Sequence, residues 1–182
     1  NSFENAKYEK VEKKIRFLQK VYEMKLMAIT MNDRESELAR LMFVFSCFTG
    51  MAIADMENLE YSHIQTAADG QRYIRKERQK TKVEFVVPLH PIAEAIIRHC
   101  LEEQKGNEEQ QTVKEKGKKH IFPRECSRSV IDGRLSIVGK ACGIRERLSY
   151  HMARHTFGTM SLSAGIPIES IAKMMGHASI SS

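Results

Sequence analysis

The chain has 182 residues, which is about the length of one domain and enough to enclose a hydrophobic core. Hydrophobic residues make up 42% and charged residues 29% of the sequence, a balance that is typical of globular proteins and excludes a chain that is disordered as a whole. The net charge of +6 favours a polyanionic partner.

The first third of the chain predicts a polar arm followed by helices. Residues 1–14 are polar and lysine-rich, and we expect them to form a linker or lead-in arm. Apolar side chains within residues 17–27 indicate a short first helix. Residues 33–48 predict a strongly apolar helix, and Gly50 fits the position just after its end. Residues 53–59 are expected to form another short helix.

A β segment follows, and the rest of the chain is helical by pattern. Residues 72–78 and 83–89 resemble two strands, joined by a turn over residues 79–82. Residues 102–119 are polar and predict a solvated helix end and a surface loop. The remaining predicted helices cover residues 91–100 and 127–142, the segment from Ser149 to Gly165, and the segment from Pro167 to Gly176. The expected fold class is mainly α with a small antiparallel β-sheet (α+β).

The sequence gives no sign of a membrane or an oxidising compartment. Residues 41–56 are the most apolar stretch, but the stretch is short and contains Asp55, so it predicts a buried helix. None of the four cysteines forms a C-x-x-C pair, which indicates reduced thiols without a disulfide framework or a zinc site. With no visible signal peptide, we expect a cytoplasmic protein. We expect it to use no cofactor.

One cluster of side chains carries the most chemical information. His151, Arg154 and His155 have the spacing i, i+3, i+4, which places them on one face of a helix. Such a cluster is costly in a core but well suited to binding a phosphodiester. Two further features point the same way: His177 follows a glycine at a helix end, and Lys80 lies in the turn of the hairpin.

The order of these motifs resembles the catalytic domain of the tyrosine recombinases, or phage-type integrases. The resemblance rests on Thr49-Gly50, the Lys80 hairpin, the box over residues 151–159 and the box over residues 174–181. It covers residues 15–182, which we expect to form the catalytic domain. The sequence around residues 47–52 and at the hairpin is similar to integrases of Bacteroidetes mobile elements and conjugative transposons.

The resemblance implies a metal-independent mechanism. A tyrosine attacks a DNA phosphodiester, forms a 3′-phosphotyrosyl link and frees a 5′-hydroxyl, while cationic side chains stabilise the charge on phosphorus. Arg154 would bind the phosphate, Lys80 would protonate the leaving oxygen, and His177 would donate a hydrogen bond. His151 would move the proton of the nucleophile or hold the phosphate, whereas His155 would support the helix.

The sequence departs from the family pattern at Ala52, where the first catalytic arginine is normally found. Our hypothesis is that Arg78 replaces it, because residues two apart on a strand share a face and Arg78 could face the same site as Lys80. Arg40 and Arg75 are the alternatives. Asp55 matches the acidic position that usually braces the absent arginine, and a plain surface or capping role is equally compatible. The DNA-binding set is expected to be Arg75, Arg78, Lys80, Arg154 and His155.

The second departure concerns the nucleophile. The family places its tyrosine nine positions after the histidine that matches His177, which lies beyond Ser182. Tyr150 adjoins His151, but neighbouring positions on a helix point in different directions. We therefore expect this fragment to be inactive by itself.

Three functions remain open at this level. The leading one is a site-specific recombinase that integrates or excises a mobile element as a DNA-bound tetramer on double-stranded DNA. A non-catalytic DNA-binding module is suggested by Ala52 and the net positive charge. A type IB topoisomerase would share the chemistry but act as a monomer.

Overall fold

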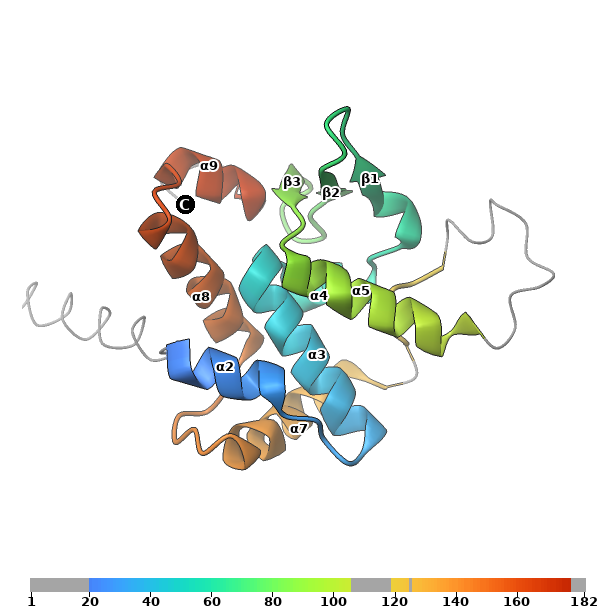
Figure 1. Cartoon of the computed structure of the whole chain (residues 1–182), viewed down its shortest axis with the longest axis vertical. Helices are drawn as coiled ribbons and strands as arrows, with labels where there is room; N and C mark the ends of the chain where they lie inside the picture. Colours follow the sequence, from blue (N-terminus) through green and yellow to red (C-terminus); the bar gives the residue numbers. More distant parts are fainter. Residues whose placement is uncertain (1–19, 106–118, 125, 178–182) are drawn as a thin grey trace, which may run out of the picture.

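The structure is a computed structural model that describes residues 20–105, 119–124 and 126–177. Helices surround a central apolar helix, and a three-stranded antiparallel sheet lies at one side, as the sequence predicted (Figure 1). The expected arm over residues 1–14 and most of the polar stretch after residue 102 lie outside the described ranges.

The central helix is α3, Arg34–Thr49. Its first turn is capped by the side chain of Asp33, which accepts a hydrogen bond from the Ser36 backbone N–H at 2.9 Å. Most of its residues are buried because α5 (Pro91–Glu103), α7 (Arg128–Ala141) and α8 (Tyr150–Ser163) pack around it.

The apolar stretch over residues 41–56 is divided between two helices at Gly50, where the sequence predicted a helix end. Gly50 has φ +72°, a left-handed conformation that ends α3, and a new helix begins three residues later. That helix, α4, covers Ile53–Glu57 and is two residues shorter than expected. The other short elements are α2 (Lys20–Ala28), η1 (Tyr61–His63) and α9 (Ile168–Met174). None of the described helices is long and apolar enough to cross a membrane.

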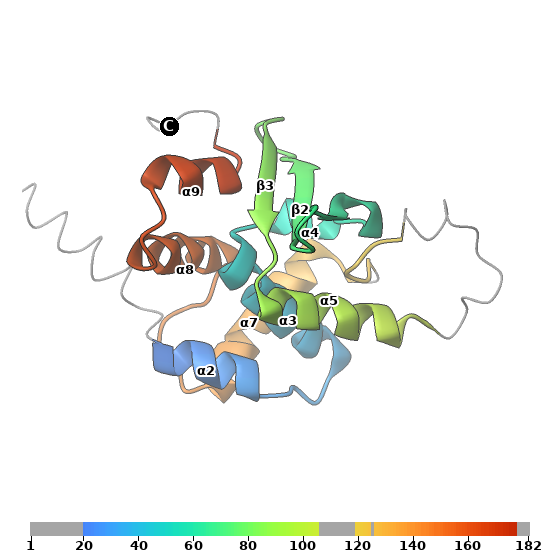
Figure 2. The same cartoon turned by 45° about the horizontal axis from the view of Figure 1, so that its top comes forward.

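The sheet has the order β1–β2–β3, with β1 at Ile64–Thr66, β2 at Arg72–Glu77 and β3 at Glu84–Pro88. Strand β1 was not predicted. The loop between β2 and β3 covers residues 78–83 and is longer than the expected turn. Helix α9 packs against β3, so the hairpin loop and the end of α9 lie at the same edge of the molecule (Figure 2).

Candidate active site

Arg154 lies on α8 and links two other segments of the chain. Its Nε donates to the Gly50 carbonyl at 2.7 Å, and its Nη2 donates to the Met175 carbonyl at 3.0 Å. Burial, and then the charge of Arg78, lower the pKa of the Arg154 guanidinium to about 10, while Asp55 opposes the shift. The group is therefore still a cation at neutral pH. The two backbone bonds occupy one side of the guanidinium and leave the Nη1 N–H groups and one Nη2 N–H for an anion.

His151 and His155 lie on the exposed side of the same helix, as the spacing predicted. Their Nε2 atoms are 2.9 Å apart and their rings are nearly perpendicular, at 87°. One ring must donate and the other accept at this distance, so the pair holds at least one neutral imidazole. Burial, followed by the charges of His151 and Arg154, lowers the pKa of His155.

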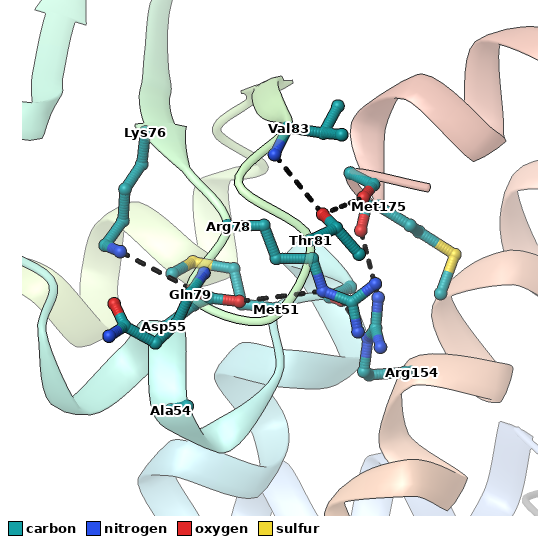
Figure 3. A network of polar contacts seen from close by, with 12 residues as sticks. Met51, Ala54, Asp55, Lys76, Arg78, Gln79, Thr81, Val83, Arg154 and Met175 are labelled. Carbon is teal, nitrogen blue, oxygen red and sulfur yellow. Dashed lines mark hydrogen bonds and ion pairs between the residues drawn. The ribbon is translucent and has the colours of Figure 1, made fainter. Parts of the chain in front are cut away.

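Arg78 is buried at the start of the hairpin loop, with 9% of its side chain exposed. Its Nε lies 3.9 Å from Oδ2 of Asp55 and has no hydrogen-bond partner, although the atom is fully buried. Figure 3 shows the guanidinium of Arg78 extending toward that of Arg154. Because the pKa of Arg154 responds to Arg78, two cations share one region of low solvent access.

Lys80 differs from Arg78 in exposure. Arg78 is buried and Lys80 is exposed, because β2 ends at Glu77 and strand alternation does not continue into the loop. Arg78 and Lys80 therefore do not share a strand face, and that part of the prediction was wrong. The loop nevertheless reaches the end of α9, since the Thr81 hydroxyl donates to the Gly176 carbonyl at 2.9 Å.

His177 completes the group at the end of α9. Burial, followed by the charges of Arg154 and Arg78, lowers the pKa of His177, so both arginines act on this imidazole. Gly176 has φ +67°, and a Cβ there would lie 3.1 Å from Cδ of Arg78. A glycine is thus required both for the turn and for the close packing of the arginine.

Arg40 and Arg75, the alternative replacements for the arginine absent at Ala52, contact other residues. Arg40 is buried, donates from Nη1 to the Leu26 carbonyl at 2.8 Å, and forms an ion pair with Glu37. Arg75 is half-exposed on the face of β2 opposite to Lys76, with its Nε 3.6 Å from Glu84. Arg40 remains a prediction as a substitute, and Arg75 as a substitute and a DNA contact. Neither shares the contacts of Arg78.

Tyr150 faces the core, as the helical geometry predicted. It is 6% exposed, its hydroxyl lies 3.3 Å from the Ala39 carbonyl, and burial raises the pKa of that hydroxyl. A phenol in such surroundings resists forming the phenolate that a nucleophile requires.

Lys76, which is buried and pairs with Asp55, was not singled out from the sequence. Only 6% of its side chain is exposed, and its Nζ lies 3.5 Å from Oδ1 of Asp55. The burial of Lys76 could have been inferred in part, because Lys76 is two residues from Ile74 and shares its apolar face of the strand. Among the described residues, no three or more His, Cys, Asp or Glu side chains form a group that could hold a metal ion.

Comparisons with known proteins show the family and the fold of the chain. The sequence model of the Phage integrase family matches residues 16–182. Tyrosine recombinase XerD of Halalkalibacterium halodurans is 26% identical over 137 residues, covering 73% of this chain and 43% of that protein. A tyrosine recombinase of Thermosipho africanus is 22% identical over 181 residues, covering 100% of this chain and 60% of that protein. The chain thus spans about half the length of these relatives.

Solved structures share the fold. XerA recombinase superposes with a TM-score of 0.66 at 20% identity, over 91% of this chain and 55% of that one. XerH site-specific recombinase bound to its difH substrate gives a TM-score of 0.65 at 20% identity, over 88% of this chain and 45% of that one. With a family match over nearly its whole length, the chain belongs to the phage integrase family of tyrosine recombinases.

Proposed function

We propose that this chain is the catalytic domain of a site-specific recombinase that breaks and rejoins double-stranded DNA through a 3′-phosphotyrosyl intermediate. Several proteins of similar fold were solved with DNA: XerH with difH, the Tn1549 integrase with transposon right end DNA, and lambda integrase with a core site. These similarities support DNA as the partner of this chain and integration or excision of a mobile element as its task.

The observation that carries the proposal is the meeting of Arg78, Arg154 and His177 beside a single buried carboxylate, Asp55. Two permanent cations and an imidazole exceed the one negative charge that faces them. Burial, followed by repulsion from neighbouring cations, lowers the pKa of Arg154 and His177, and a bound phosphate would offset that repulsion. A buried, positively charged site of this kind is suited to a phosphodiester and to the extra charge of its transition state.

The two arginines have complementary donors for such an anion. Arg154 has the Nη1 side of its guanidinium uncommitted, which allows a two-pronged contact with non-bridging oxygens. Arg78 has a buried Nε that faces Asp55 at 3.9 Å without a hydrogen bond, and a donor of that kind gains from a ligand that accepts from it. This supports Arg78 as the replacement for the arginine absent at Ala52.

The remaining roles follow from position. Lys80 is the general acid for the leaving 5′-oxygen, since it is exposed on a loop that reaches the α9 end of the site. His177 donates to the phosphate, and His151 holds the phosphate or takes the proton of the nucleophile. The nucleophilic tyrosine is nine positions after His177, and the active assembly is a tetramer of the parent protein on paired sites. No step in this scheme requires a metal.

The test is covalent capture of DNA by the parent protein that carries this domain. With a nicked substrate that loses its cleaved strand, the protein should form a DNA adduct resistant to denaturation and sensitive to protease, in the presence of EDTA. Arg154→Ala and Arg78→Ala should each reduce adduct formation by roughly a hundredfold or more, as expected for lost charge stabilisation. Arg98→Ala serves as the control, because it removes the same charge from an exposed position of α5.

Two outcomes would overturn parts of the proposal. DNA binding without any adduct would indicate the non-catalytic binding module instead. Unchanged adduct formation by Arg78→Ala would refute the assignment of Arg78 while leaving the recombinase function standing.

A further inference from the structure

The hairpin loop is fastened to the rest of the molecule on both sides of Lys80. On one side, the backbone N–H of Gln79 donates to Oδ1 of Asp55 at 2.8 Å. On the other side, the hydroxyl of Thr81 donates to the Gly176 carbonyl at 2.9 Å. Figure 3 shows these contacts around the loop. Lys80 therefore lies between two residues that are held by different elements.

Asp55 is a rigid anchor for the first of these contacts. Only 3% of its side chain is exposed, and its carboxylate faces Lys76 Nζ at 3.5 Å and Arg78 Nε at 3.9 Å. Contacts with two cations and a backbone N–H fix the orientation of this buried carboxylate. Asp55 belongs to α4, which begins just after Gly50, and Gly50 supplies the carbonyl that accepts from Arg154.

Thr81 forms the second contact, and its side chain is also held in place. Its hydroxyl oxygen also accepts from the Val83 backbone N–H at 3.3 Å, which fixes the rotamer from within the loop. The acceptor, the Gly176 carbonyl, adjoins the Met175 carbonyl, which receives the second hydrogen bond from Arg154 at 3.0 Å. The two hydrogen bonds of the loop thus connect it to the two segments whose carbonyls accept from Arg154.

We propose that Asp55 and Thr81 are positioning residues for Lys80, and that they set the place of its ammonium group relative to the phosphate bound by Arg154. This inference rests on the proposed function. A lysine side chain is long and flexible, so an exposed lysine delivers a proton efficiently only when its backbone is held. Within the loop, the Arg78 N–H to Val83 carbonyl and Lys82 N–H to Arg78 carbonyl bonds, both 2.9 Å, add to this rigidity.

The step that these residues would assist can be isolated by changing one atom of the DNA. In the normal reaction the tyrosine hydroxyl loses its proton to a base, for which His151 is the candidate, and its oxygen forms a bond to phosphorus. The bond from phosphorus to the 5′-oxygen breaks, and Lys80 gives a proton to that oxygen. If sulfur replaces the bridging 5′-oxygen, the leaving group departs as a thiolate. A thiol has a pKa of about 8.5 and needs no proton from the enzyme to leave.

The experiment compares cleavage of the oxygen and sulfur substrates by the parent protein carrying Thr81→Val or Thr81→Ser. Valine has nearly the shape of threonine but lacks the hydroxyl, whereas serine keeps it. Thr81→Val should slow cleavage of the oxygen substrate by about tenfold to a hundredfold and leave cleavage of the sulfur substrate within about twofold of wild type. Thr81→Ser should behave as wild type on both substrates.

The anchor at Asp55 is tested in parallel. Asp55→Asn retains an oxygen that can accept from the Gln79 N–H, and Asp55→Ala does not. Asp55→Ala should show the larger selective loss on the oxygen substrate. If that variant fails to fold, as judged by its thermal unfolding, the Thr81 pair decides the question alone.

The outcomes separate this inference from the proposed function. Equal slowing of both substrates by Thr81→Val would overturn the positioning role, because a general defect in folding or phosphate binding does not depend on the leaving group. Lys80→Met should be rescued by the sulfur substrate. If Lys80→Met is not rescued, Lys80 is not the general acid and the proposed function fails at that step, whatever Thr81 does.

Discussion

Arg154 donates a hydrogen bond from Nε to the carbonyl of Gly50 at 2.7 Å, although 104 residues separate them in the sequence. The acceptor is presented by the left-handed turn that ends α3, where Gly50 has φ +72°. The ring of Phe157 closes over the same glycine, so that the end of α3 and the middle of α8 fit only with a hydrogen at this position. Arg154 is thus held by backbone geometry.

Substitution of that glycine should damage both stability and the site. In Gly50→Ala the new Cβ would lie 2.5 Å from Cδ1 of Phe157, in a backbone conformation that alanine disfavours. We expect a loss of about 3 kcal/mol in the free energy of unfolding, from strain and overpacking together. Gly133→Ala is the control, because Gly133 lies within α7 with open space around it and should gain about 0.5–1 kcal/mol. Urea unfolding of the two variants measures the difference, and equal stabilities would contradict the account.

The buried pair of Lys76 and Asp55 should show strong energetic coupling. Lys76→Met keeps the length of the side chain but leaves Asp55 with one fewer partner, and we expect it to cost about 3 kcal/mol. In an Asp55→Asn background the same change should cost at least about 1 kcal/mol less, because no buried carboxylate remains to be compensated. Chemical denaturation of the four proteins gives the coupling energy. Additive effects would show that the two charges do not stabilise one another.

Stability should depend on pH through His155. Burial, then the charge of His151 and that of Arg154, lowers the pKa of His155 below its ordinary value of 6.5. The unfolded chain therefore binds a proton at this residue at a higher pH than the folded chain does. The free energy of unfolding should fall as the pH drops from about 6.5 toward the folded pKa.

The effect of His151 on the pKa of His155 can be measured directly at the His155 ring. In His151→Gln the neighbouring positive charge is removed, so the pKa of His155 should rise. NMR titration of the His155 ring signals in wild type and variant reports the change directly. A pKa of His155 that stayed the same or fell in the variant would contradict the role assigned to the pair.

DNA binding by this chain should be weak and depend steeply on salt. Each phosphate contact made by a cation contributes about 0.9 to the slope of log affinity against log salt concentration. Arg75→Gln should reduce that slope by about this amount if Arg75 contacts the backbone, as its half-exposed position on β2 allows. Arg98→Gln changes the same charge on an exposed position of α5 and should leave the slope unaltered. Fluorescence anisotropy at several salt concentrations distinguishes the two, and an affinity that barely changes with salt would exclude phosphate-dominated binding.

Elements with strong local signals were predictable from the sequence. The Gly50 turn after α3 and the Ser149 cap of α8 were both confirmed, the latter accepting from the Met152 N–H at 3.2 Å. Strand β1 was missed because Ile64–Thr66 is three residues long and has too little alternation to stand out. Its existence depends on pairing with β2, which is a tertiary effect.

The sequence singled out candidate residues for a site but did not show the contacts between them. The family motifs identified Arg154 and His177, and the structure brings them together with Arg78. Sequence patterns could not show that Arg78 is buried and Lys80 exposed, because the strand ends one residue before Arg78. The contact of Thr81 with Gly176 joins segments 95 residues apart and has no local signature.

The most direct test of the central claim is a solved structure of the parent protein bound to its DNA site before cleavage. The account predicts that N–H groups of Arg78 and Arg154 both lie about 2.7–2.9 Å from non-bridging oxygens of one phosphate, with His177 donating to the same group. A complex in which Arg78 stays against Asp55 and a different cation binds that phosphate would contradict it.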